Sequence, residues 1–168
     1  MIPAEIEFWL VRHGRTAAND EGRYQGRRDF CLSEAGIREA ESVSRRLSKA
    51  PGFELFLSSD LQRAWKTAEI ISRGINLAPL REPLLRESSW GFIEGLRRSE
   101  AEAMYPFLFR SPGGALAALR CGGESERKLL ARTRTLRRKI CRKYPGMRRI
   151  LLVSHGRLFN AFISGCLG

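Results

Sequence analysis

Short apolar runs alternate with amphipathic stretches along most of this chain. The strand-like runs are residues 6–11, 53–57 and 148–153. The stretches with helical spacing of apolar residues are 33–49, 60–74 and 125–143, and a further helix is expected after Gly156. Because this alternation is typical of strands joined by helical crossovers, we expect an α/β fold, a three-layer α/β/α sandwich around a mostly parallel sheet.

Individual residues indicate where these elements begin and which of their faces are buried. The run 6–11 is largely apolar, as in a central buried strand. Ser33 is a suitable N-cap for the first long helix. Its inner face is expected to carry Ile37, Ala40, Val43 and Leu47. The stripe of the next helix comprises Leu61, Ala64, Ala68 and Ile71, and residues 75–77 are expected to be extended.

A chain of 168 residues suits one domain with one core, and no stretch reads as a linker, so we expect a single domain over 1–168. The segment from about 88 to 123 is irregular, with a helical patch at 99–104. Pro112-Gly113-Gly114 and Gly122-Gly123 break it further. We interpret it as an insert that forms a substrate pocket.

The chain contains two histidines, and each follows an apolar run in the same way. The two segments are Leu10-Val11-Arg12-His13-Gly14-Arg15 and Leu152-Val153-Ser154-His155-Gly156-Arg157. Ligands of open α/β sheets bind outside the carboxyl ends of the strands, so both imidazoles are expected to face one crevice. Glycine allows close backbone approach, and helix N-termini offer N–H donors to an anion. A single His-Gly is usually just a turn, but the pair with its arginines predicts a site for a dianion such as phosphate.

The net charge of +12 is concentrated in the stretch 120–149, which supplies +10 of it and contains the helix expected at 125–143. The buried stripe of that helix is expected to be Leu129, Thr133, Leu136, Ile140 and Tyr144. Its basic positions are Arg127, Lys128, Arg132, Arg134, Arg137, Arg138, Lys139, Arg142 and Lys143. The favoured interpretation is a solvated face, and the alternative is a docking surface for an acidic partner. Interleaved aromatics and DNA-binding motifs are lacking, so nucleic acid is expected only as a non-specific polyanion.

Residues 1–7 contain two acids and no basic residue, and no apolar run approaches the about 20 residues that span a bilayer. We therefore expect no secretory signal, no membrane partner and a cytoplasmic location. The four cysteines, Cys31, Cys121, Cys141 and Cys166, form no C-x-x-C pair. They are expected to be buried free thiols, without a disulfide or a metal site. The assembly state stays open, with a homodimer as one option.

Five short motifs occur in a fixed order. The first is Arg12-His13-Gly14-Arg15-Thr16, followed by Asn19, Gln25-Gly26, Asp29, Leu32 and Gly36. The others are Ser58-Ser59-Asp60-Leu61-Gln62-Arg63-Ala64 with Thr67-Ala68, Leu85-Arg86-Glu87 with Gly91 and Glu94-Gly95, Gly122-Gly123-Glu124-Ser125, and Ser154-His155-Gly156. Together they resemble the motifs of the histidine phosphatase (phosphoglycerate mutase-like) superfamily, branch 1. Within it, the resemblance is to α-ribazole phosphatase-like or broad-specificity phosphatases. The resemblance spans residues 8–166, and five motifs in order are far more specific than one Arg-His-Gly.

The resemblance implies a phosphomonoesterase of that fold. His13 would accept the phosphate as nucleophile, and Arg12, Arg63 and His155 would hold its oxygens. Glu87 would protonate the leaving oxygen and then activate water. Further phosphate contacts would be Thr16, Asn19, Gln25, Gly26 and Gly156. With this cationic cradle neither a metal nor a cofactor is needed.

Some alternatives stay open. On spacing alone, Arg63 is equally consistent with an ordinary surface arginine and with a phosphate contact. Glu87, taken without its motif, is more consistent with a surface carboxylate. Glu94 rivals Glu87 as the acid, whereas Glu124 is expected to be structural or capping. The rival functions are a phosphoglycerate mutase, which needs the same histidines, and a non-enzymatic binder of anions or nucleic acid.

The chain also departs from the family pattern at three positions. Cys31 stands where proline is usual, Ile93 where tryptophan is frequent, and Arg157 where glycine is common. Many relatives continue with another strand after the helix that follows the second histidine. This sequence ends at Gly168, so we expect a sheet without that edge strand, in a trimmed or naturally short form.

Overall fold

A computed structural model describes residues 6–109 and 120–167. It contains a sheet whose strands all run parallel in the order β1-β4-β2-β3. The strands are β1 (Glu7–Arg12), β2 (Leu55–Ser58), β3 (Leu80–Arg81) and β4 (Arg149–Ser154). The α-helices are α1 (Ala17–Asp20), α2 (Glu34–Leu47), α3 (Gln62–Ile75), α4 (Arg98–Met104), α6 (Glu126–Lys143) and α7 (Gly156–Leu167). Three 3₁₀ turns are η1 (Pro83–Leu85), η2 (Gly91–Ile93) and η3 (Pro106–Leu108).

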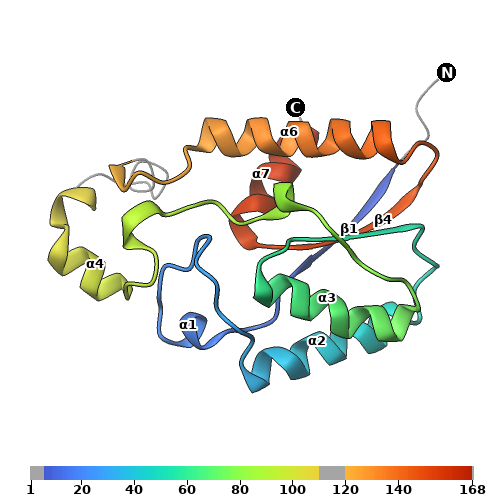
Figure 1. Cartoon of the computed structure of the whole chain (residues 1–168), viewed down its shortest axis with the longest axis horizontal. Helices are drawn as coiled ribbons and strands as arrows, with labels where there is room; N and C mark the ends of the chain where they lie inside the picture. The colour runs from blue at the N-terminus through green and yellow to red at the C-terminus, as the bar shows by residue number, and fades with distance from the viewer. Residues whose placement is uncertain (1–5, 110–119, 168) are drawn as a thin grey trace.

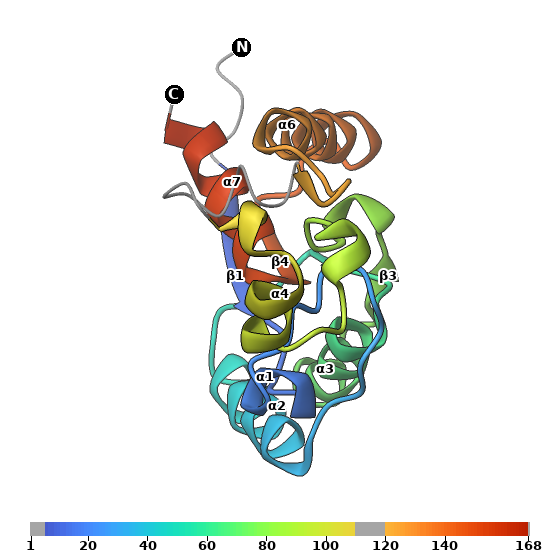
Figure 2. The same ribbon diagram turned by 90° about the vertical axis from the view of Figure 1, so that its left-hand side faces the viewer.

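Helices cover both faces of the sheet, as the two views at right angles show (Figures 1 and 2). Side chains of a strand point alternately to opposite faces. On one face Leu55, Leu57, Ile150 and Leu152 join the side chains of α6 and α7. On the other face Phe56, Leu151 and Val153 join those of α2 and α3. The expected three-layer α/β/α sandwich with a parallel sheet is therefore confirmed.

The central strands β2 and β4 form the core. Every residue of β2 is buried, and so is every residue of β4 after Arg149. Burying one large aliphatic side chain contributes roughly 1.5–3 kcal/mol, so these two strands account for much of the stabilisation. The first predicted strand, in contrast, is not central. β1 lies at one end of the strand order, and its residues from Phe8 to Val11 are only partly buried.

Serine side chains cap helices α2 and α6, at Ser33 as predicted and at Ser125, whereas α3 begins at Gln62 without a side-chain cap. The Ser33 side chain accepts from the Gly36 N–H, and the Ser125 side chain accepts from the Lys128 N–H. α6 buries Leu129, Thr133, Leu136 and Ile140 as expected. In α2, however, Ile37 is 37% exposed, and Gly36 is buried instead. The reason is that α2 starts close against the loop after β1, where a Cβ on Gly36 would collide with the Arg15 carbonyl.

The connection after α3 differs from the prediction. Residue 75 still belongs to the helix, which ends at Asn76 with a left-handed φ of 52°. The short strand that follows is β3, at Leu80–Arg81, rather than residues 75–77. A residue with positive φ commonly ends a helix, and asparagine accepts this conformation better than most side chains do.

The described part of the insert has its own small core. Ile93, Ala101, Leu108 and Cys121 are all buried there. Residues 110–119, which include the predicted break at Pro112-Gly113-Gly114, lie outside the described residues. All four cysteines are free, but only Cys121 is buried, so the expectation of buried thiols is wrong for the other three. None of the helices in the described ranges is both long and apolar enough to cross a membrane.

Candidate active site

The two histidines come together because their strands are neighbours. Arg12 of β1 is aligned with Ser154 of β4, so the next residue of each strand is a histidine. The His13 N–H donates to the Ser154 carbonyl at 2.9 Å, and the two imidazole centroids lie 5.0 Å apart. The carboxyl edge of the sheet thus holds both rings, as open α/β folds do with their ligand-binding residues.

The hydrogen bonds of His13 fix which nitrogen can react. Nδ1 lies 2.8 Å from the Gly14 carbonyl, which can only accept, so Nδ1 carries the hydrogen. Nε2 therefore carries the lone pair of the ring, which accepts a hydrogen bond from Arg63 Nε at 3.3 Å. Burial is the main reason that the pKa of His13 is lowered to about 3, and the neighbouring Arg63 and Arg12 act in the same direction. Near neutral pH the ring is uncharged.

Arg63 is almost fully buried, with 1% of its surface exposed. Its Nη2 donates to the Gly26 carbonyl at 2.7 Å and its Nη1 to the Arg28 carbonyl at 3.0 Å. Gly26 has a φ of 53°, and a Cβ there would collide with the Glu94 carboxylate. The backbone conformation that directs the Gly26 carbonyl toward Arg63 thus requires glycine. Arg63 is held as a rigid cation beside His13, rather than as a surface arginine.

His155 is fully buried behind His13 and does not line the cleft. Its Nε2 lies 3.0 Å from the Ser59 hydroxyl, which itself accepts from the Leu61 N–H. Nδ1 has no hydrogen-bond partner within the described ranges. Burial lowers the pKa of His155 well below its ordinary value, and the charge of Arg63 adds to this. The ring is therefore neutral, and it is buried next to the cleft rather than exposed in it.

Glu87, two residues after η1, contacts the start of α7 and lines the same cleft as His13. Its Oε1 accepts from the N–H groups of Ser88 at 2.8 Å and Leu158 at 3.1 Å, and its Oε2 accepts from the Arg157 N–H at 3.3 Å. The first N–H groups of a helix have no partners within the helix, so Glu87 satisfies two of those of α7. Gly156, the first residue of the same helix, also lines the cleft, and the N–H groups at a helix N-terminus are suited to an anion.

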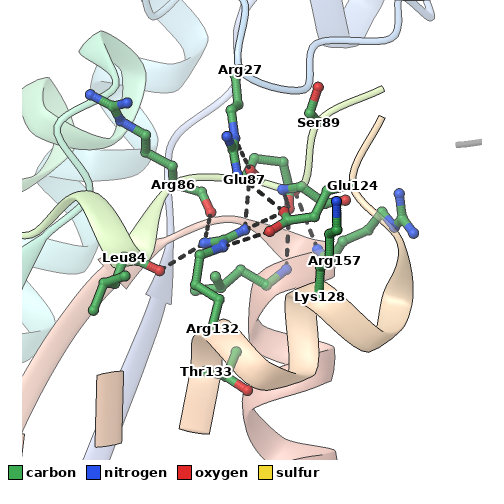
Figure 3. A network of polar contacts seen from close by, with 12 residues as sticks. Arg27, Leu84, Arg86, Glu87, Ser89, Glu124, Lys128, Arg132, Thr133 and Arg157 are labelled. Carbon is green, nitrogen blue, oxygen red and sulfur yellow. Dashed lines mark hydrogen bonds and ion pairs between the residues drawn. The ribbon is translucent and has the colours of Figure 1, made fainter. Parts of the chain in front are cut away.

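Arg132 holds the backbone that carries Glu87, although the sequence placed it among the surface cations of α6 (Figure 3). It donates to the carbonyls of Leu84 and Arg86, both at 2.7 Å. It also pairs through two nitrogens with Glu124, at 2.9 and 2.6 Å, and both side chains are about nine-tenths buried. The assignment of Arg132 to the solvated face is therefore wrong. Its position, three residues after Leu129 and four before Leu136, puts it on the inner stripe.

Glu94 has a structural position rather than a place on the cleft wall. Its Oε1 accepts from the N–H groups of Arg27 and Trp90 and from the Ser89 hydroxyl, at 2.8–3.1 Å. Its Oε2 accepts from the Arg28 N–H at 2.9 Å. The carboxylate thus ties the loop after α1 to the insert, and it does not line the cleft.

A cleft of about 370 Å³ joins most of these groups. It is lined by Arg12, His13, Asn19, Arg23, Tyr24, Gln25, Gly26, Arg63, Glu87, Trp90, Gly156, Arg157 and Asn160. A second hollow of about 550 Å³ shares Arg12, His13 and Asn19 with it. Thr16, expected as a phosphate contact, lies fully buried beneath the cleft. It caps α1 and hydrogen-bonds Asn19 and Gln25.

Sequence reasoning did not single out Arg23, Tyr24 or Asn160 on the cleft wall, and no motif distinguishes them. Their positions follow from the loop after α1 and from the first turns of α7, which fold over the strand ends. In the described ranges, no three His, Cys, Asp or Glu side chains form a group that could hold a metal ion. The positive charge at this site comes from arginines.

The lowered pKa values of the histidines predict acid sensitivity. Between pH 6.5 and 5 the unfolded chain takes up protons on both rings, whereas the folded protein does not. The free energy of unfolding should therefore fall by about 1–2 kcal/mol for each histidine over this window. Urea unfolding at the two pH values measures the loss, and His13→Asn should remove about half of it. An unchanged loss in that variant would contradict the buried, neutral state of His13.

Comparison with known proteins places the sequence in a family. Residues 8–168 match the histidine phosphatase superfamily (branch 1). Phosphoglycerate mutase-like protein 4 of Arabidopsis thaliana is 38% identical over 158 residues, which cover 92% of this chain and 68% of the relative. Probable phosphoglycerate mutase GpmB of Cronobacter sakazakii is 34% identical over 168 residues, which cover 97% of this chain and 75% of the relative.

Solved structures show the same architecture. A mycobacterial glucosyl-3-phosphoglycerate phosphatase in complex with VO3 superposes with a TM-score of 0.81 at 33% identity, covering 94% of this chain and 80% of the other. A putative α-ribazole-5'-P phosphatase from Escherichia coli superposes with a TM-score of 0.82 at 24% identity, covering 98% and 80%, and it supports the fold alone.

Proposed function

Because this chain belongs to the histidine phosphatase superfamily (branch 1), whose members are phosphatases or mutases, we propose that it hydrolyses phosphate monoesters without a metal ion. One observation carries the proposal: at the floor of the cleft, His13 presents the lone pair of Nε2, with Arg63 at 3.3 Å. Glu87 lies on the wall of the same cleft, where a leaving group would depart.

In the first step, His13 Nε2 attacks phosphorus, and the bond from phosphorus to the ester oxygen breaks. Glu87, entering the step protonated, gives its proton to the departing oxygen, so the alcohol leaves neutral. The product is phosphohistidine with a Glu87 carboxylate. A covalent intermediate divides one difficult displacement into two easier ones.

In the second step the Glu87 carboxylate takes a proton from water while the water oxygen attacks phosphorus. The bond from phosphorus to Nε2 breaks, and inorganic phosphate leaves. His13 returns to its neutral form, and Glu87 holds the proton needed for the next cycle. The hydrogen bond to the Gly14 carbonyl keeps the ring oriented through both steps.

Arginines would neutralise the transferring group. Arg63 is fixed in place by backbone carbonyls, and Arg12 is exposed at the mouth of the cleft. The Gly156 N–H at the start of α7 supplies a further donor. His155 could donate a hydrogen bond to the phosphate only from Nδ1, and only if Nδ1 carries the ring hydrogen. That tautomer is present when the Ser59 hydroxyl donates its hydrogen to Nε2. Such preorganised donors stabilise the transition state in place of a metal.

The direct test is hydrolysis of p-nitrophenyl phosphate by purified protein. We expect turnover that EDTA leaves unchanged and that vanadate inhibits competitively, because vanadate can mimic the five-coordinate transition state. Activity that EDTA abolishes and magnesium or zinc restores would disprove the metal-independent mechanism.

A mutase is the second candidate, and the names of the relatives favour it, since several are probable phosphoglycerate mutases. A mutase must return the phosphate to a second hydroxyl before water removes it. The assay measures interconversion of 2- and 3-phosphoglycerate with and without 2,3-bisphosphoglycerate. Mutase turnover that requires the bisphosphate and exceeds hydrolysis would replace our proposal.

The exposed face of α6 would have only a minor role. Lys139 pairs with Glu82, and the Arg137 guanidinium contacts the Gly165 carbonyl, while Arg134, Arg138 and Arg142 are exposed. We propose that these three cations bind polyanions weakly and without sequence preference, so that binding falls steeply with salt. A cytoplasmic location also stays a prediction.

A further inference from the structure

The cleft contains more positive charge than one phosphate group needs. Four arginines line it, Arg12, Arg23, Arg63 and Arg157, and Glu87 is the one acid among its described lining residues. A bound phosphate dianion neutralises two charges. Arg23 is paired with Glu21, and Glu87 enters the proposed first step protonated, so Arg12, Arg63 and Arg157 leave one positive charge unbalanced. The question is which arginine faces the rest of the substrate.

Three of these arginines already have a role. Arg63 is bound to backbone carbonyls beside His13. Arg23 pairs with Glu21 at 2.6 Å and donates to the Gly95 carbonyl at 2.8 Å. Arg12 directly precedes the nucleophile at the mouth of the cleft, where it reaches the phosphate in the proposed mechanism. Arg157 is the remaining one.

The Arg157 guanidinium is held in place by an aromatic ring, but one of its nitrogens lacks a hydrogen-bond partner in the described part of the chain. It stacks over the Trp90 ring, with its central carbon 4.4 Å from the ring centroid, and Trp90 packs against Tyr24 at 4.9 Å. A cation above an aromatic face is attracted to it and ordered by it. Nη1, however, is buried and has no hydrogen-bond partner within residues 6–109 and 120–167. Buried polar groups nearly always have a partner, so this one is explained if a ligand supplies it.

Arg157 also lies where a leaving group would extend. Trp90, Arg157 and Asn160 line both the cleft and an adjoining hollow of about 360 Å³. The hollow continues past them along Glu126, Leu129, Ala161 and Ser164, so Arg157 is its one cation among the described lining residues. The N–H of Arg157 donates to Glu87, which places the residue beside the proposed proton donor for the ester oxygen. The alcohol part of a substrate would therefore meet Arg157 directly after the scissile bond.

We infer that Arg157, held by Trp90, is a specificity-determining residue that binds a second anionic group on the alcohol part of the substrate. The inference rests on the proposed function and narrows its substrates to phosphate monoesters whose leaving group carries a carboxylate or a second phosphate. The planar guanidinium binds either oxyanion through two hydrogen bonds.

The test uses three phenyl phosphates that differ only at the para position, in a carboxylate, a phosphonate or a neutral carboxamide. For the wild type we expect kcat/KM to be about 10- to 100-fold higher for the anionic compounds than for the carboxamide, as for a hydrogen bond to a charged group. The difference should lie mainly in KM, because the second anion is bound equally before and during reaction. The carboxylate and phosphonate arms show which oxyanion fits better.

In Arg157→Gln the preference should fall to about one, because kcat/KM falls for the two anionic compounds much more than for the carboxamide. Arg157→Lys should keep part of the preference. Arg38→Gln, which removes an exposed cation on α2, should keep all of it. A wild type without preference, or a preference that survives in Arg157→Gln, would overturn the inference.

A second measurement separates this inference from the proposed function. Para-carboxy- and para-carbamoyl-benzylphosphonate cannot be hydrolysed, and calorimetry gives their Kd directly. We expect the carboxylate compound to bind about 10-fold or more tightly to the wild type and without advantage to Arg157→Gln. If the esters are not hydrolysed but this difference appears, the proposed function fails and the anion site stands. Equal binding of the two phosphonates refutes the site whatever the enzyme does.

Discussion

His13→Ala is expected to abolish phosphatase activity, with a loss on the order of 10⁴–10⁶-fold, the scale seen when a covalent nucleophile is removed. Nε2 of this ring carries the lone pair, because the Nδ1 hydrogen is committed to the Gly14 carbonyl, and among the described residues only Arg63 Nε, at 3.3 Å, donates to it. Water attacking directly would lack the two-step route. The measurement is turnover of p-nitrophenyl phosphate by the two proteins at equal concentration.

Chemical trapping makes the result specific. Wild-type protein quenched during turnover should carry phosphate that is labile in acid and stable in base, as phosphohistidine is, and His13→Ala should carry none. Thermal unfolding of both proteins checks that the variant is folded. Phosphate found on a serine or a cysteine would show that the nucleophile is a different residue.

Glu87→Gln should slow hydrolysis of an alkyl phosphate by about 10²–10⁴-fold, the usual contribution of a general acid. The effect on p-nitrophenyl phosphate should be much smaller, because its phenolate leaves readily without a proton. The measurement is kcat/KM for both substrates in both proteins. Equal losses on the two substrates would indicate that Glu87 binds or supports the site without transferring a proton.

Glu94→Gln is the matched control, since it makes the same chemical change seven residues away. Its carboxylate accepts four hydrogen bonds from the loop after α1 and from the insert. An amide turns one acceptor into a donor that faces donors, so we expect a loss of stability of about 1–3 kcal/mol. Both substrates should be slowed alike. Selective loss on the alkyl phosphate here, and not in Glu87→Gln, would identify Glu94 as the acid.

The sequence predicted the elements whose burial follows a simple period. Leu129, Leu136 and Ile140 repeat at helical spacing and are buried in α6, while Ser33 and Ser125 start their helices. The two histidines were predictable for a different reason. Each directly follows an apolar run, and parallel strands bring their carboxyl ends to one edge of the sheet.

The remaining features depend on which elements become neighbours, and periodicity does not contain that information. The apolar run of β1 suggested a central strand, but β4 took the central position. Arg132 resembles the other cations of α6 until the backbone before Glu87 is seen to pass over it. Thr16 belongs to a phosphatase motif, yet its hydroxyl lies under the cleft because it caps α1.

The strand order has a consequence for how the protein folds. β1 and β2 do not pair with each other, and both pair with β4, which comes last among the strands in the sequence. The contact between Glu7 and Arg149 spans 142 positions. During synthesis β1 cannot form its hydrogen bonds to β4 until residues 149–154 have been made. Contacts between residues so far apart in the sequence slow folding. Because β4 lies between β1 and β2 and follows both in the sequence, the sheet edge that holds the two imidazoles cannot form until β4 has been synthesised.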